Sequence, residues 1–225
     1  MSKKENAEGK VKKRWPVKAV MEQIYKKNLW GGSGQDFYSG TGSHDPGLVE
    51  PYVEATSDFL RSFDEALVVC DQGCGDFNIG RQLVQYTRKY IAVDIVEDLI
   101  MRNREKFKNR KVDFQCLDLA LDPLPSGDCA LLRQVLQHLS NAEIKRIVAK
   151  LQPYKYVIVT EHVPEGDFNA NLDILSGQGI RLKKQSGVDL TAPPFNLKVK
   201  EEKELLSLRF RNYDGLLITT LYTIH

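Results

Sequence analysis

The sequence predicts an α/β fold: a doubly wound, mostly parallel seven-stranded sheet with helices on both faces and a C-terminal antiparallel hairpin. Two patterns predict it. Short apolar runs alternate with helical patterns of about ten residues, which is typical of parallel strands joined by helical crossovers. Near the C-terminus, two apolar runs flank the turn-like stretch RNYDG, which indicates a hairpin. A chain of 225 residues with 42% hydrophobic content can bury one core, so residues 15–225 are predicted to form a single domain.

The first fourteen residues form a basic segment with six lysines or arginines and two glutamates, a net charge of +4. Because the whole chain carries +2, the remainder carries −2. The segment lacks apolar periodicity and is predicted to be a disordered tail, with anion binding as the alternative. The four cysteines form no Cys-x-x-Cys pair and are predicted to be reduced core thiols. No apolar run reaches the roughly 20 residues of a membrane span, and no signal-peptide pattern is present, so a cytoplasmic protein is expected.

The first predicted helix covers residues 17–30, where apolar side chains recur at helical spacing. A glycine-rich segment follows at residues 31–47 and includes the aromatic residues Phe37 and Tyr38 directly after Trp30. Glycine and serine disfavour regular structure, whereas aromatic side chains prefer burial. The segment is therefore predicted to be a long loop, either a linker or a lid over a ligand.

From residue 51 the pattern becomes regular, with each predicted strand separated from the next by a helix or a loop. The predicted helices cover residues 51–63, 78–86, 97–107 and 141–152. The predicted strands cover residues 66–70, 90–95, 112–119, 128–135 and 154–163, with the hairpin at 203–210 and 215–224. In such open sheets a ligand binds beyond the carboxyl ends of the strands, where the strand order reverses. The candidate site therefore lies at these strand ends, namely residues 71–76, Asp94, Asp118, Arg133 and Glu161.

The stretch VVCDQGCGDFNIG places two glycines, Gly73 and Gly75, directly after the first predicted strand. A turn without Cβ atoms lets a ligand approach the main chain closely. A dinucleotide fingerprint requires a further glycine where Asn78 stands, and the Gly-Lys-Ser/Thr of a phosphate loop does not follow. The carboxylates of Asp71 and Asp76 flank the turn, and they repel phosphate but suit an ammonium or sulfonium group.

Together with Asp94 at the end of YIAVD and Asp118 in FQCLDL, the stretch DQGCGD resembles the class I, Rossmann-like S-adenosylmethionine-dependent methyltransferases over residues 67–162. The resemblance implies S-adenosyl-L-methionine as cofactor, with the glycine turn under its methionine part. It also implies that Asp94 binds the ribose hydroxyls and Asp118 the adenine amine. Alternatively, Asp94 caps the following helix and Asp118 forms a turn. The cofactor-binding residues expected from the resemblance are Asp71, Gly73, Gly75, Asp94, Asp118, Leu119 and Arg133.

Methyl transfer to oxygen requires a base, whereas no metal is needed in principle. His138 follows the fourth predicted strand, where it is suited either to catalysis or to packing. Glu161 and His162 leave the fifth strand at the ligand face, the alternative being a solvated strand end. His138, Glu161 and His162 are therefore the candidate catalytic residues. His44, in the glycine-rich segment, is a weaker candidate.

These observations favour a methyltransferase that acts at an oxygen of a small molecule, such as a sugar or cell-envelope precursor. The segments NLWGGSG, SGTGS and APPFN are similar to parts of small bacterial methyltransferases. A methyltransferase that binds nucleic acid through the basic tail is an alternative, although the nearly neutral charge of the remaining chain disfavours it. Arg133 and Gln134 also stand where base-methylating enzymes carry an Asn/Asp-Pro-Pro-Tyr/Phe motif. A non-catalytic module that binds the cofactor is the third hypothesis. The sequence leaves the oligomeric state and the acceptor open.

Overall fold

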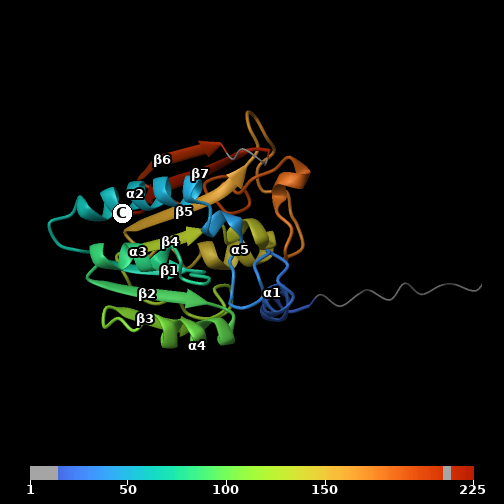
Figure 1. Ribbon diagram of the computed structural model, residues 1–225. Coiled ribbons are helices and arrows are strands. Elements are labelled where there is room, and N and C mark those ends of the chain that lie inside the picture. Colours follow the sequence, from blue (N-terminus) through green and yellow to red (C-terminus); the bar gives the residue numbers. More distant parts are fainter. Residues whose placement is uncertain (1–14, 210–213) are drawn as a thin grey trace, which may run out of the picture.

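The computed structural model describes residues 15–209 and 214–225, so the predicted basic tail lies outside the described residues. Its centre is a seven-stranded sheet with strand order β3-β2-β1-β4-β5-β7-β6 (Figure 1). The first five strands are parallel, whereas β7 is antiparallel to both β5 and β6. The predicted fold class, including the C-terminal hairpin, is confirmed. The strands are β1 (Val68–Gln72), β2 (Lys89–Asp94), β3 (Val112–Cys116), β4 (Cys129–Arg133), β5 (Tyr156–Val163), β6 (Glu201–Arg209) and β7 (Leu216–Thr223).

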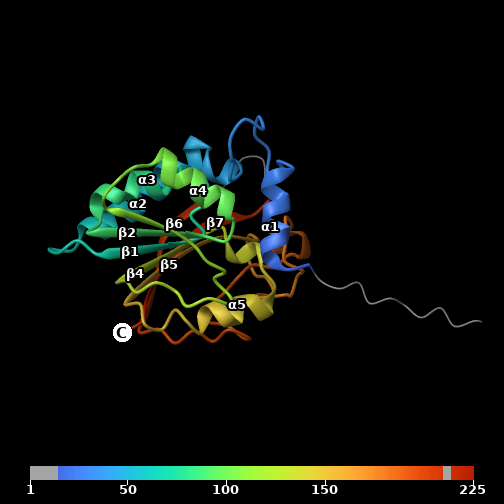
Figure 2. The same ribbon diagram turned by 90° about the horizontal axis from the view of Figure 1, so that it is seen from below.

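Helices cover both faces of the sheet, and Figure 2 shows α2, α3 and α4 on one face and α5 on the other. Helix α1 lies at one end of the sheet, beside the carboxyl ends of the parallel strands (Figure 1). In the described part of the chain, no helix has the length and apolarity needed to cross a bilayer. The helices are α1 (Val17–Lys26), α2 (Pro46–Arg61), α3 (Gly80–Leu83), α4 (Glu97–Lys106) and α5 (Asn141–Val148). The 3₁₀ turns are η1 (Thr41–Ser43), η2 (Val84–Tyr86), η3 (Leu136–His138) and η4 (Arg181–Lys184).

Two hydrophobic cores form because successive strand residues point to opposite faces of the sheet. In β1, for example, Val69 belongs to the core beneath α2 and α3, whereas Cys70 belongs to the core beneath α5. In β4, Leu131 and Leu132 divide in the same way. Burial on both faces explains why these strands read as continuous apolar runs in the sequence.

Several predicted boundaries differ from the structure. Helix α2 begins at Pro46 rather than at residue 51, because the side chain of Asp45 accepts a hydrogen bond from the Gly47 N–H (2.8 Å) and Pro46 occupies the first helical position. Pro51 then lies inside the helix. Helix α1 ends at Lys26 rather than at residue 30, since Asn28 adopts a left-handed conformation with φ of 49°. The loop between the two helices therefore covers residues 27–45 instead of 31–47, and it contains η1.

Candidate functional site

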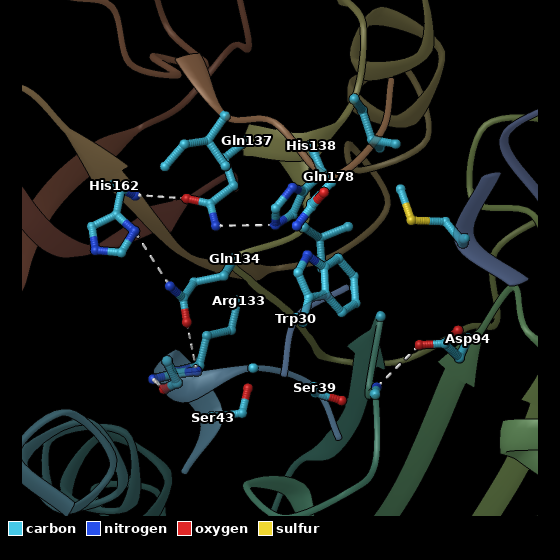
Figure 3. Close-up of a pocket in the computed structure, with 18 of the residues that line it drawn as sticks. Trp30, Ser39, Ser43, Asp94, Arg133, Gln134, Gln137, His138, His162 and Gln178 are labelled. Atoms are coloured by element: carbon cyan, nitrogen blue, oxygen red, sulfur yellow. Dashed lines mark hydrogen bonds between the residues drawn. The ribbon is translucent and has the colours of Figure 1, made fainter. Parts of the chain in front are cut away.

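A cavity of about 750 Å³ lies at the carboxyl ends of the parallel strands, with α1 and the segment from Trp30 to Ser43 among its walls (Figure 3). In Figure 3, Asp94 lies on one side of the cavity, with Arg133 and His162 across from it. The structure therefore brings together side chains from four strands, as the sequence predicted for an open sheet. The predicted site residues that line the cavity are Asp71, Gly73, Gly75, Asp94, Asp118, Leu119, Arg133, His138 and His162.

The turn after β1 contains two glycines because its surroundings leave no room for side chains at these positions. Gly73 and Gly75 both have positive φ, at 97° and 54°. A Cβ atom on Gly73 would lie 2.4 Å from Cγ2 of Val135, and one on Gly75 would lie 2.3 Å from Oγ of Ser39. Both positions therefore require glycine for conformation and for space, and the turn presents main chain to the cavity.

Two buried carboxylates lie beside this turn. Asp94 accepts hydrogen bonds from the N–H groups of Gly75 and Val96, each at 3.0 Å. Asp71 accepts one from the hydroxyl of Tyr90 at 2.8 Å. Burial raises the pKa of Asp71 to about 7 and that of Asp94 to about 6, and these hydrogen bonds act in the opposite direction. The cavity thus holds two desolvated acidic groups that are suited to hydroxyl and ammonium donors.

Asp118 forms the turn that follows β3. Its Oδ1 accepts hydrogen bonds from the N–H groups of Ala120 (2.8 Å) and Leu121 (3.2 Å), as the turn interpretation predicted. Leu119 is buried and lines the cavity together with Ile95, which follows β2. These residues form a mostly apolar wall on the Asp94 side, with one carboxylate at its edge.

Arg133 holds the glycine-rich segment against the sheet. Its Nη2 donates to the carbonyl of Gly42 (2.7 Å), its Nη1 donates to Oε1 of Gln134 (3.0 Å), and its guanidinium carbon lies 4.8 Å from the ring centroid of Tyr52. A Cβ on Gly42 would lie 2.2 Å from Oε1 of Gln134, so a side chain there would displace the Gln134 amide. Arg133 therefore lines the cavity and also binds the segment that covers it. Its position at the end of β4 does not predict this second contact.

Hydrogen-bond partners assign the tautomers of the two cavity histidines. Nδ1 of His138 lies 3.1 Å from the carbonyl of Gly177, which can only accept, so Nδ1 carries the proton and Nε2 keeps a lone pair. The Gln137 amide donates to that Nε2 over 3.3 Å. In His162 the lone pair is instead on Nδ1. Gln134 accepts from Arg133 through Oε1, so the Gln134 Nε2 donates to Nδ1 of His162 (3.4 Å). Figure 3 shows this chain of contacts.

The environment of both imidazoles disfavours their protonated form. Burial lowers the pKa of His138 to about 4, and His162 across the cavity adds to that effect. Burial, followed by the charge of Arg133, also lowers the pKa of His162. His138 alone therefore combines neutrality with an Nε2 lone pair at the cavity wall.

Glu161 does not line the cavity, contrary to the expectation for a catalytic residue. Its carboxylate is buried in the sheet and accepts hydrogen bonds from the N–H groups of Val135 (3.2 Å), Leu136 (2.8 Å) and Gln137 (2.9 Å). Burial raises the pKa of Glu161 to about 8, and these three N–H groups and Arg181 oppose that rise. Side chains alternate along β5, which explains why adjacent Glu161 and His162 have different surroundings.

The contacts that fix the glycine-rich segment were not predicted. Asp76, which closes the glycine turn, accepts hydrogen bonds from the N–H of Ser39 (2.9 Å) and from His44 Nε2 (2.6 Å), and neither Asp76 nor His44 lines the cavity. Asp36 pairs with Arg102 of α4 and with Lys106 (2.8 Å). These partners lie 32 to 70 residues apart in the sequence, and no local sequence pattern predicts such pairs.

Aromatic side chains complete this cover. The rings of Trp30 and Phe37 lie 5.2 Å and 5.6 Å from the ring of Tyr25 in α1, and Trp30 also lies 5.2 Å from His138. Tyr38 instead stacks on His44 within the segment, at 4.4 Å. The cover thus has aromatic contacts both to α1 and to the cavity wall.

The residues present fit S-adenosylmethionine. The turn of Gly73 and Gly75 leaves main chain exposed where side chains would fill the space, and Asp71 and Asp94 provide acceptors for an ammonium group and for ribose hydroxyls. The apolar wall that includes Ile95 and Leu119 suits a flat base. Nothing in this part of the cavity conflicts with the cofactor.

Comparisons with known proteins agree with this fit. Residues 69–153 match the family model of a methyltransferase domain. A comparison with curated proteins finds no match. Among solved structures, the chain is similar to the N-methyltransferase NodS from Bradyrhizobium japonicum WM9 in complex with S-adenosyl-L-homocysteine. The TM-score is 0.64 and the identity 10%, and the match covers 92% of this chain and 100% of that one.

Two further structures are similar over nearly the whole chain. Magnesium protoporphyrin IX methyltransferase (ChlM) from Synechocystis PCC 6803, with bound S-adenosylhomocysteine, has a TM-score of 0.58 and 16% identity over 92% of this chain and 100% of that one. Human N-acetylserotonin methyltransferase in complex with S-adenosylmethionine has a TM-score of 0.57 and 13% identity over 93% of this chain and 60% of that one. At these identities the structures show a shared fold, that of the class I, Rossmann-like S-adenosylmethionine-dependent methyltransferases. Within this fold, residues 69–153 match a methyltransferase domain.

Proposed function

We propose that this enzyme transfers a methyl group from S-adenosylmethionine to an oxygen atom of a small hydroxylated molecule, such as a sugar or cell-envelope precursor. The observation that supports the proposal is a cavity of about 750 Å³ in which the neutral His138 and the carboxylates proposed to bind the cofactor line the same space. Acceptor and cofactor have to share this volume, which favours a small acceptor. Polar side chains around the rest of the cavity, including Ser43, Gln178 and Gln185, suit hydroxyl groups.

The cofactor half of the cavity is proposed to work through its carboxylates. Asp94 accepts the two ribose hydroxyls, Asp71 accepts the ammonium group, and Asp118 accepts the adenine amine. The main chain of the glycine turn lies under the methionine part, while Leu119 and Arg133 bound the pocket. When bound, the cofactor supplies a methyl group that its sulfonium activates for in-line displacement. The chain itself aligns the reactants and excludes water.

On the acceptor side, His138 is proposed to be the general base. Its Nε2 lone pair takes the proton of the acceptor hydroxyl, while Nδ1 stays protonated and bound to Gly177. The Gln137 contact to Nε2 is long, at 3.3 Å, so an acceptor hydroxyl can replace it. His162 is proposed to form part of the acceptor wall, held in place through the contact of its Nδ1 with Gln134.

The segment of residues 31–47 is proposed to act as a lid rather than as a linker. Asp76 binds the segment through Ser39 and His44, and the basic residues Arg102 and Lys106 of α4 bind it through Asp36. The Asp36 pairs are exposed, and such pairs contribute only about 0–1 kcal/mol each, so this cover can open at modest cost. Closure would keep water from the methyl-transfer site.

S-adenosylhomocysteine is expected to slow amide hydrogen exchange in residues 31–44. The D76N variant is expected to exchange faster there without ligand, because it loses the charged acceptor of Ser39 and His44. Hydrogen exchange followed by mass spectrometry measures both effects, and D58A, which removes an exposed helix pair in α2, serves as the control. Exchange that is slow in the free protein and indifferent to ligand would identify a fixed wall instead of a lid.

Two other functions would require different features of the structure. A nucleic-acid methyltransferase would use the basic tail, but the covered cavity and the body charge of −2 disfavour a polyanion. A non-catalytic module would retain the cofactor residues without need of a base at the acceptor side. The N-methyltransferase activity named for NodS makes an amine acceptor a further possibility to test.

Transfer of a labelled methyl group to a panel of acceptors tests the proposal. The panel contains sugars, nucleotide sugars and polyols, small amines, and RNA and DNA, each incubated with the full chain and labelled cofactor. Label in hydroxylated small molecules, and none with D94A, supports the proposal. Label only in amines overturns the assignment to oxygen, and label only in nucleic acid overturns the small-molecule acceptor. Cofactor binding without transfer to any of the three classes favours the non-catalytic module.

A further inference from the structure

The 3₁₀ turn η3, which carries His138, is held by a buried acidic side chain from a neighbouring strand. The carboxylate of Glu161 in β5 accepts the N–H groups of Val135, Leu136 and Gln137 at 2.8 to 3.2 Å. All three donors belong to consecutive residues at the start of the turn, which have no intrahelical acceptors there. Glu161 is only 3% exposed, so this carboxylate is committed to the turn rather than to solvent or ligand.

A buried basic side chain binds the carbonyl groups of the same turn. Arg181, which is 1% exposed, donates through Nη1 to the carbonyl of Leu136 (3.0 Å) and through Nη2 to that of Leu139 (2.7 Å). A longer contact reaches the carbonyl of Gln137 (3.4 Å). Glu161 thus satisfies the N–H groups of the turn, and Arg181 satisfies its carbonyl groups.

Arg181 also links the turn to the acceptor that orients the His138 ring. Its Nε donates to the carbonyl of Leu172 (3.1 Å), in the segment that leads to Gly177. Gly177 in turn bonds His138 twice, because its N–H donates to the His138 carbonyl (2.9 Å) and its carbonyl accepts from Nδ1 (3.1 Å). The main chain and the ring of His138 are therefore both tied to elements that Arg181 connects.

The energetic cost of this arrangement indicates a use beyond packing. A buried carboxylate and a buried guanidinium each lose hydration, and apolar residues of similar volume often stabilise a fold as well or better. A regular helix would satisfy most of these backbone groups without any side chain. The chain instead devotes two buried ionisable side chains to a three-residue turn, which holds one imidazole at the cavity wall.

We propose that Glu161 and Arg181 are positioning residues, which together hold His138 in the Nδ1–H tautomer with its Nε2 lone pair toward the acceptor. Neither side chain acts on substrate; they act through the backbone of η3 and through Gly177. The catalytic consequence rests on the proposed role of His138 as base, whereas the geometric consequence concerns the imidazole itself and is measurable without an acceptor.

The test follows the ¹⁵N shifts of the His138 imidazole in the full chain across pH 4.5–8.5, with assignment by H138N. The variants are E161Q, R181M and R181K. The matched control is T160V, which removes a buried hydrogen bond to Thr219 (2.9 Å) from the residue beside Glu161. Affinity for S-adenosylhomocysteine is measured for each variant by calorimetry to confirm that the cofactor half is intact.

In the wild type, His138 is expected to stay in the Nδ1–H form over this range. In E161Q its pKa is expected to rise by at least one pH unit toward the usual value of about 6.5, with a mixture of tautomers, because a loosened turn admits water. The direction is diagnostic, since loss of whatever negative charge Glu161 carries would by itself lower the pKa of His138. R181M is expected to mix the tautomers as well, R181K less so, and T160V not at all.

An unchanged His138 titration in folded E161Q and R181M would overturn the proposal and leave both side chains with a purely structural role. Should E161Q fail to fold, R181K decides in the same titration, because it keeps the charge and loses the forked geometry. Altered affinity for S-adenosylhomocysteine together with altered tautomers would show a general disturbance and also count against the proposal. Failure of every acceptor in the panel would refute the proposed function without changing these outcomes.

Discussion

Replacing Asp94 with alanine is expected to lower the affinity for S-adenosylhomocysteine by roughly 10²–10⁴-fold. The carboxylate is 8% exposed at the end of β2, and its proposed partners are two ribose hydroxyls. Each hydrogen bond to a charged group contributes roughly 1.5–3 kcal/mol, so the loss of two amounts to about 3–6 kcal/mol. Isothermal titration calorimetry measures the change directly.

The exposed Asp98 of α4 provides the control, because D98A removes a nearby carboxylate that does not line the cavity. The wild-type affinity is also expected to fall as the pH is lowered from 8 to 5. Burial raises the pKa of Asp71 to about 7 and that of Asp94 to about 6, so both take up protons over this range and lose acceptor capacity. An affinity for D94A equal to that of the wild type would refute the proposed cofactor contact.

Replacing His138 with alanine is expected to lower kcat by roughly 10²–10⁴-fold, the usual contribution of a general base. Steady-state assays at saturating cofactor, with the acceptor that the panel identifies, measure this loss. Because burial lowers the pKa of His138 to about 4, wild-type kcat is expected to decline only as the pH approaches that value, where protonation removes the Nε2 lone pair. The neighbouring His162 contributes to this lowering.

Cofactor affinity of H138A is expected to match that of the wild type, since His138 lies away from Asp94 (Figure 3). The exposed C-terminal His225 provides the matched control, and H225A is expected to retain full turnover. Turnover of H138A within threefold of the wild type would exclude His138 as the base and direct attention to another group.

The sequence was sufficient to predict the fold because the relevant signals are local. Apolar runs with helices between them indicate a parallel sheet, and the glycine turn with Asp94 and Asp118 lies at strand ends that such a sheet brings to one edge. Boundaries were less well predicted. Helix α2 begins five residues earlier than expected, because the side-chain cap of Asp45 and the proline after it outweigh the weaker periodic signal.

The candidate cofactor residues and the two cavity histidines were also accessible from sequence, since each lies at the end of a strand or shortly after it. Glu161 was misplaced because the assignment depended on which side of β5 each residue faces, and alternation sends it beneath η3 while His162 faces the cavity. No local pattern indicates which residues at a strand end face the cavity and which face the other side of the sheet. The role of Arg181 was not predicted at all, since its partners around η3 and at Asn141 lie 40 to 45 residues away.

By itself, then, the sequence determined the sheet, its C-terminal hairpin and a glycine turn flanked by acidic residues, because periodicity, turn chemistry and strand ends are properties of neighbouring residues. Only the tertiary structure decided which groups meet across long separations. It joined Asp76 to Ser39, and it gave His138 its tautomer through Gly177. These contacts depend on how loops close over the sheet, and loop closure is governed by packing and burial of the whole chain rather than by any local pattern.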